Sequence, residues 1–187
     1  IAGGFFTFAG GVDIGFGIAQ WNGSNWSSLG SGLDRNALSL AVLTNGNLIV
    51  GGSFGAAGGV NIGFGIARWN GVSWSALGSG VNDSVFSLTP LANGQFVAGG
   101  SFAAAGSVVA NNVARWTGTG WAAMGTGMNN FVFSLTTLPN GNVVAGAAFT
   151  QINNGLTVLY TPRHNSTAWS ALGVGVSDWV NTVAALP

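Results

Sequence analysis

The chain has 187 residues, enough for one domain with a buried core, yet only 4% of them are charged, against about a quarter in an average domain. It contains neither Lys nor Glu, and its formal net charge is zero. The sequence therefore lacks the basic surface of a protein that binds nucleic acid or anionic lipid, and it has no apolar run long enough to predict a transmembrane helix.

The chain consists of four copies of one segment, which we expect to form a single repeat domain. A Gly-Gly pair, or Gly-Ala in the last copy, marks the same place in each: Gly3-Gly4, Gly51-Gly52, Gly99-Gly100 and Gly146-Ala147. Successive pairs are 47 or 48 residues apart, which gives repeats at about 1–48, 49–96, 97–143 and 144–187. A period in this range indicates one supersecondary unit that buries its apolar faces against its neighbours.

The second copy shows the expected elements most clearly. Residues 47–54 are apolar and follow an Asn-Gly turn, so they predict a buried strand, and the glycine-rich residues 55–63 predict a loop. Residues 64–69 and 73–77 predict two further strands joined by the hairpin turn Asn70-Gly71. Residues 85–91 predict a fourth strand.

Four short strands joined by tight turns predict one small antiparallel sheet per repeat. A series of such sheets with a period in the forties is typical of a β-propeller, whereas the rungs of a β-solenoid are usually shorter and lack paired hairpin turns. We therefore predict an all-β fold, a β-propeller of four-stranded antiparallel blades. Either residues 180–186 pair with residues 1–6 and close a ring, or the segment belongs to a longer array or an oligomeric propeller.

Two sets of residues are predicted to hold the blades together. The first set is the glycine pairs within apolar strands, Gly51, Gly52, Gly99 and Gly100, where a missing side chain allows another group to approach closely. The second set is the tryptophans that recur once per repeat, Trp26, Trp74, Trp121 and Trp169. We expect these indoles to pack over the glycine pairs between adjacent blades.

The order of these features resembles that of a known class of repeat. Residues 93–121 read Asn-Gly, apolar strand, Gly-Gly, variable loop, Ala-Arg-Trp, turn, Trp, and this order resembles kelch and galactose-oxidase-like propeller blades and the surface-propeller repeats of bacteria and fungi. It is more loosely similar to five-bladed lectins of the tachylectin type. The resemblance covers all four copies and implies a propeller, but it implies no activity, because the copper-ligand and cysteine features of the oxidase are missing.

The inventory of reactive side chains predicts no catalytic, cofactor or metal site. His164 is the single histidine, it stands where other copies have Trp21, Trp69 and Trp116, and no nucleophile motif surrounds it. The four aspartates do not have the spacing of a calcium loop. Arginine and aspartate recur fifteen residues apart in two copies, which suggests the ion pairs Arg68–Asp83 and Arg163–Asp178; two unrelated exposed positions are the alternative.

These observations favour a secreted or cell-surface structural protein that associates with itself, because near-zero net charge promotes association. The main alternative is a glycan-binding module, since eight tryptophans and many neutral polar residues suit stacking and hydrogen bonding to sugars. A tryptophan exposed at the same place in every blade would favour the second function. An enzyme is not expected.

Overall fold

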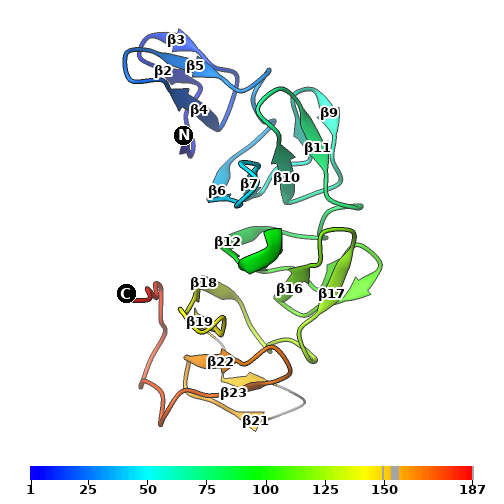
Figure 1. The fold of residues 1–187 in the computed structure, drawn as a ribbon, viewed down its shortest axis with the longest axis vertical. Helices are drawn as coiled ribbons and strands as arrows, with labels where there is room; N and C mark the ends of the chain where they lie inside the picture. The colour runs from blue at the N-terminus through cyan, green and yellow to red at the C-terminus, as the bar shows by residue number, and fades with distance from the viewer. Residues whose placement is uncertain (149, 153–155, 187) are drawn as a thin grey trace.

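The computed structural model describes residues 1–148, 150–152 and 156–186, and it shows an all-β protein of successive antiparallel sheets (Figure 1). Three sheets have four strands each: β6 (Ala37–Val42), β7 (Leu48–Gly52), β10 (Ile66–Trp69) and β11 (Trp74–Ala76); β12 (Val85–Pro90), β13 (Phe96–Gly100), β16 (Val113–Trp116) and β17 (Trp121–Ala123); β18 (Val132–Thr137), β19 (Val143–Ala147), β22 (Pro162–His164) and β23 (Trp169–Ala171). A first sheet has three: β1 (Ala2–Gly3), β4 (Ile18–Trp21) and β5 (Trp26–Ser28).

We call these sheets blades one to four in chain order, and their strands inner, second, third and outer. Blade one has a second, third and outer strand only. A short hairpin connects the second and third strands of each blade: β2 (Phe8–Ala9) with β3 (Val12–Asp13), β8 (Ala56–Ala57) with β9 (Val60–Asn61), β14 (Ala104–Ala105) with β15 (Val108–Val109), and β20 (Gln151–Ile152) with β21 (Leu156–Thr157). The predicted loop at residues 55–63 therefore contains a small hairpin.

The predicted strands exist, but one of them belongs to a different sheet. Residues 85–90 form the inner strand of blade three, because β12 pairs with β13 across the turn at Ala92–Gly94. The sequence repeat 49–96 thus spans two blades. The first three strands of each repeat and the last strand of the repeat before it make one sheet.

The blades follow one another along an open arc (Figure 1). Both ends of the chain lie on its concave side, and residues 180–186 lie against blade four rather than beside β1. The four-bladed ring closed by pairing of residues 180–186 with residues 1–6 is therefore not the arrangement seen in this structure.

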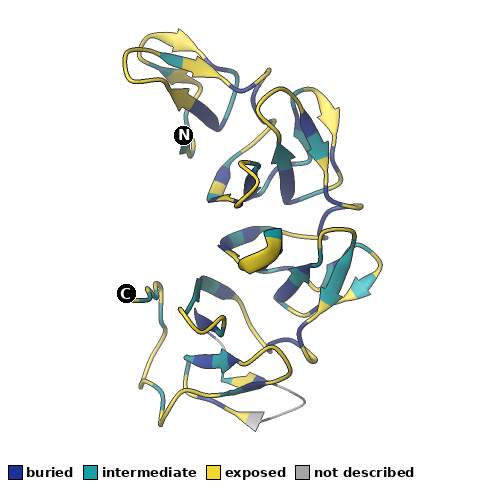
Figure 2. Cartoon of the chain, in the orientation of Figure 1, coloured by how far each residue is buried: buried dark blue, intermediate teal, exposed yellow. Residues whose placement is uncertain are grey.

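The apolar core is divided into separate clusters, each between two successive blades. Figure 2 marks the buried residues of the chain in dark blue. One cluster joins Ile49 and Ile66 of blade two to Phe96 and Ala114 of blade three. A second cluster combines residues of blades one and two, and a third combines residues of blades three and four. The contact between neighbours, rather than the interior of a blade, is thus the unit of burial.

Glycine in the second strand sets how closely two blades approach. A Cβ placed on Gly51 would lie 2.6 Å from Val85 Cγ1 and 3.3 Å from Leu88 Cδ1, both on the inner strand of the next blade. The same relation recurs at Gly99, whose added Cβ would lie 2.5 Å from Val132 Cγ1. The predicted close approach at the glycine pairs is present, but no tryptophan makes it. Val and Leu side chains approach the first glycine of each pair, whereas the second glycines, Gly52 and Gly100, lie against the backbone carbonyls of Asn36 and Ser84.

The recurring tryptophans pack on other glycines. The ring of Trp74 lies over Gly58 of its own blade, and it lies beside Gly30, which follows the outer strand of the preceding blade. Its indole Nε1 donates a hydrogen bond to the carbonyl of Leu29 at 2.8 Å. Trp74 therefore joins two blades, as predicted, but at their outer edge.

Replacing Gly99 with Ala tests the close approach directly. We expect the added methyl group to force Val132 and the inner strand of blade four outward, at a cost of about 1–3 kcal/mol in the free energy of unfolding. Gly120→Ala is the matched control, since an added Cβ there meets nothing within 4 Å, and it should change stability by less than about 0.5 kcal/mol. Urea unfolding monitored by tryptophan fluorescence measures both, and equal costs would contradict this account.

Candidate functional site

The structure brings no reactive cluster together. In residues 1–148, 150–152 and 156–186, no three His, Cys, Asp or Glu side chains lie close enough to hold a metal ion. Nor does this part of the chain contain a helix with the length and apolar character needed to span a membrane. The recurring features of the described residues are instead the contacts between blades and the surfaces at the two ends of the arc.

The predicted ion pairs do not form. The Nε of Arg68 donates to the Ser75 hydroxyl on the neighbouring strand at 3.0 Å, and Asp83 Oδ1 accepts from the Ser84 amide at 2.6 Å. Asp178 likewise accepts from the amide of the next residue, Trp179, at 2.7 Å. The fourth residue of the two pairs, Arg163, has a buried Nε with no hydrogen-bond partner in the described part of the chain.

The contact between blades repeats with the same atoms. The indole nitrogens of Trp74, Trp121 and Trp169 donate to the carbonyls of Leu29, Leu77 and Met124 at 2.8, 3.0 and 3.0 Å. Each acceptor follows the outer strand of the preceding blade. A second recurring bond runs from the amides of Leu88, Leu135 and Val183 to the hydroxyls of Ser39, Ser87 and Ser134, which lie on the preceding inner strand.

Each contact has two halves: the indole and second strand of one blade, and the residues that follow the outer strand of the blade before it together with the preceding inner strand. Blade one has the first of these halves, and no other blade covers it in this structure. Trp26 has the same place in its blade as Trp74, and its ring covers Gly10 as Trp74 covers Gly58. Its indole nitrogen makes no hydrogen bond within the described residues, where no other sheet offers it a carbonyl. The adjacent Trp21 is 46% exposed, whereas its counterpart Trp116 is 8% exposed.

Residues 172–186 present the other half. Leu172 corresponds to Leu29 and Leu77, but it is 43% exposed where each of those is 1% exposed. An added Cβ on Gly173 would meet nothing within 4 Å, although the corresponding Gly30 lies against Trp74. Residues 180–186 take the position of an inner strand: Val180 and Val183 pack against Gly146, and the Val180 amide donates to the Ala147 carbonyl.

A row of aromatic rings follows the inner strands. Phe86 and Phe133 are the extra residues at the β-bulges of β12 and β18, where register shifts occur, and bulges of this kind redirect a side chain. Their ring centroids lie 6.2 Å apart, and Phe133 continues to Trp179 at 6.4 Å. The contact with Phe133 holds Trp179 against blade four and leaves it 63% exposed.

His164 departs from the repeat pattern and lies between blades three and four. Its ring is edge-on to Trp169 at 4.9 Å, and its Nδ1 accepts a hydrogen bond from the Ser166 amide at 3.1 Å. Burial lowers the pKa of the imidazole below its usual value, and the positive charge of Arg115 lowers that pKa further. The sequence marked this position as divergent without indicating what surrounds it.

Comparison with known proteins supplies no family. No protein-family model matches the chain, and no curated protein matches its sequence significantly.

The lowered pKa of His164 predicts a pH-dependent stability. The unfolded chain takes up the proton more readily than the folded one, so the stability contributed by neutral His164 is complete above about pH 6.5 and is lost as the pH falls below it. We expect the free energy of unfolding to decrease between about pH 7.5 and pH 5.5, a range in which ordinary aspartates stay ionised.

His164→Phe retains a ring beside Trp169 but cannot titrate, so its stability should be nearly constant over that range. Urea titrations of both proteins at several pH values provide the measurement. An equally steep decrease in His164→Phe would assign the pH dependence to another group.

Proposed function

We propose that this protein is a non-enzymatic scaffold whose copies associate head to tail. In this proposal, residues 172–186 of one copy cover blade one of the next copy. The observation that carries the proposal is that the two uncovered surfaces are the two halves of the contact that already joins each of the four blades to the next.

The first support is the missing inner strand of blade one. In blade two, Leu40 lies opposite Val50 and Ser39 lies opposite Gly51. By repeat position, Val183 of one copy would lie opposite Ala2 of another, and Thr182 opposite Gly3. Strand addition of this kind satisfies the edge of β1 and gives residues 180–186 a hydrogen-bonded partner.

The second support is the unused indole donor. Trp26 of the second copy would donate to the carbonyl of Leu172, as Trp74 donates to Leu29 within the chain. This contact would bury Trp21, Trp26 and Leu172 together. Tryptophan in a desolvated pocket is the residue type most often found at the energetic centre of an interface.

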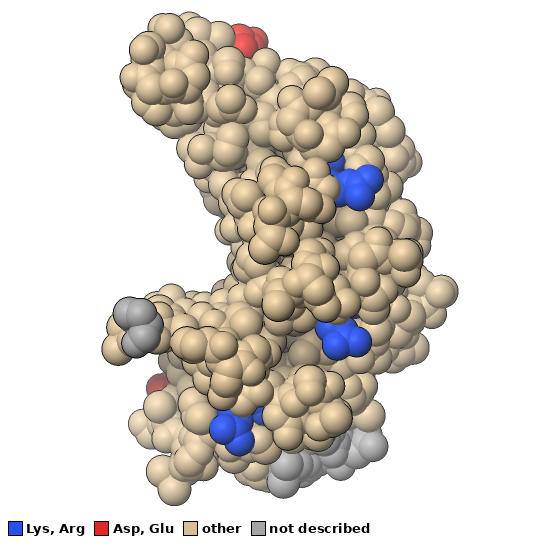
Figure 3. All heavy atoms as spheres, in the orientation of Figure 1, with Lys and Arg blue, Asp and Glu red and all other residues tan. Residues whose placement is uncertain are grey.

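The third support is the near absence of surface charge that could make two copies repel each other. Figure 3 shows a face of the molecule on which charged side chains are few and scattered, and the formal net charge is zero. Copies therefore do not repel one another over long distances. We propose a secreted or cell-surface location for the assembly on this composition.

Glycan binding is the weaker alternative. A lectin with one site per blade would expose a tryptophan at the same place in each repeat. Instead, the exposed fraction of the tryptophan at this repeat position falls from 46% at Trp21 in blade one to 8% at Trp116 in blade three, and the fourth copy has His164 there. This decrease follows the presence of a preceding blade, as expected for residues whose role is to join blades.

Sedimentation velocity over a range of protein concentrations tests the scaffold proposal. We expect species that are multiples of the 18.7 kDa chain, with the larger species increasing as concentration rises. Leu172→Arg should weaken association about tenfold or more, because it places a charge at the centre of the proposed contact. Its thermal unfolding should be nearly unchanged, since Leu172 is exposed in the single chain.

Val72→Arg provides the matched control. Val72 is 84% exposed at the tip of a hairpin and belongs to neither uncovered surface, so the same new charge should leave association unaltered. A chain that stays monomeric at every concentration would refute the proposal, and so would equal effects of Leu172→Arg and Val72→Arg.

A further inference from the structure

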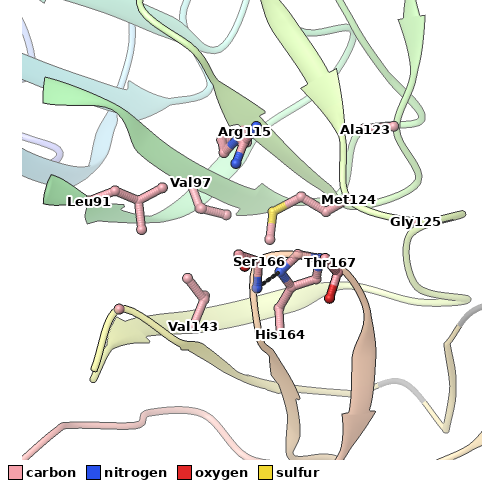
Figure 4. A pocket seen from close by; sticks show the side chains of 11 residues that line it. Leu91, Val97, Arg115, Ala123, Met124, Gly125, Val143, His164, Ser166 and Thr167 are labelled. Atoms are coloured by element: carbon pink, nitrogen blue, oxygen red, sulfur yellow. Dashed lines mark hydrogen bonds between the residues drawn. The ribbon is translucent and has the colours of Figure 1, made fainter. Parts of the chain in front are cut away.

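Between blades three and four lies a cavity of about 120 Å³, lined by residues that include Arg115, Gly125, His164 and Ser166 (Figure 4). Its position is explained by the repeat. Trp69 approaches Gly30 at the first contact between blades, and Trp116 approaches Gly78 at the second. At the third contact, the smaller His164 replaces that indole and leaves open the space beside Gly125.

A second departure from the repeat affects the same cavity. Arg68 lies opposite Ser75 and donates to its hydroxyl. The corresponding Arg115 lies opposite Ala122, which offers no acceptor. Arg115 makes no hydrogen bond or ion pair within the described residues, so its guanidinium keeps its donors available at the wall of the cavity.

The other polar groups of the cavity suit a negatively charged occupant. None of the lining residues is acidic. His164 uses Nδ1 as the acceptor from the Ser166 amide, so in its neutral form the ring carries its proton on Nε2 as a donor. Ser166 adds a hydroxyl group to the same wall.

We propose that this cavity is a binding site for a small oxyanion, a phosphate or a carboxylate group, held by Arg115 with His164 and Ser166. A guanidinium presents paired N–H donors that match two oxygens of such a group. The volume of about 120 Å³ is well above the minimum that one water molecule requires, and it leaves room for a phosphate or a short carboxylate. This site is separate from the two surfaces of the proposed assembly.

Binding should be linked to the protonation of His164. The positive charge of Arg115 helps to lower the pKa of His164, and a bound anion would offset that charge and favour the imidazolium. Arg115 from β16 is the only other titratable or charged group among the lining residues. Linkage then requires that affinity for the anion increase as the pH falls through the pKa of His164.

The chain has one histidine, so NMR titration of the imidazole protons reports this site without ambiguity. The pKa of His164 is measured in sodium chloride, in inorganic phosphate and in acetate at equal ionic strength. We expect phosphate, acetate or both to raise it by about one pH unit relative to chloride, the effect of one opposite charge close to the ring. The anion that raises the pKa more shows whether the site prefers a phosphate or a carboxylate group.

Variants decide whether Arg115 carries the binding. Arg115→Gln should abolish the rise, whereas Arg68→Gln, the same change at the preceding contact between blades, should preserve it. Ala122→Ser, which gives Arg115 the hydroxyl partner that Arg68 has, should reduce the rise in a protein with unaltered packing. The proposal is overturned if neither anion moves the pKa beyond its value in chloride, or if Arg115→Gln or Ala122→Ser responds like the wild-type chain.

Discussion

The close approach of one inner strand to the second strand of the preceding blade is the contact on which the rest of the structure depends. It is possible because Gly51, Gly99 and Gly146 have no Cβ, so that Val and Leu side chains reach the backbone of the neighbouring sheet. The apolar clusters form around these contacts. Since each cluster needs two blades, a single blade of this sequence has almost no interior of its own.

A contact made of two different halves has a structural consequence. A blade with a neighbour on both sides uses one half of the contact toward the blade before it and the other half toward the blade after it. A blade with a neighbour on one side only therefore has one half uncovered. Such heterologous contacts generate rings where the rotation closes and filaments where it does not. In this chain the uncovered halves contain the exposed Trp21 and Leu172 and the partly buried Trp26, and this geometry connects the fold to the scaffold that we propose.

Much of the fold could be predicted from the sequence because its signals are local. Asn-Gly turns and apolar runs identified the strands, and the period identified repeated sheets. The division into blades could not be read from the period, since residues 85–91 belong equally well to either neighbour until β12 pairs with β13. The hairpins of two-residue strands were missed because so short a strand shows no alternation.

The sites were harder to predict because they depend on contacts between blades, which local sequence signals do not specify. The sequence singled out the glycines and tryptophans correctly as residues that recur, but it could not say which glycine lies beneath which ring. The pairing of Arg68 with Asp83 failed because a constant spacing does not fix the direction of a side chain. The cavity beside His164 required the position of Arg115, which is 49 residues away in the sequence and comes from another blade.

Hydrogen exchange of the indole N–H groups, followed by NMR in dilute and in concentrated solution, tests the central claim most directly. The account predicts that Trp74, Trp121 and Trp169 exchange slowly at both concentrations, while Trp26 exchanges quickly in dilute solution and becomes protected in concentrated solution. Rapid exchange of Trp74 and Trp121, or a Trp26 that is equally protected at both concentrations, would contradict it.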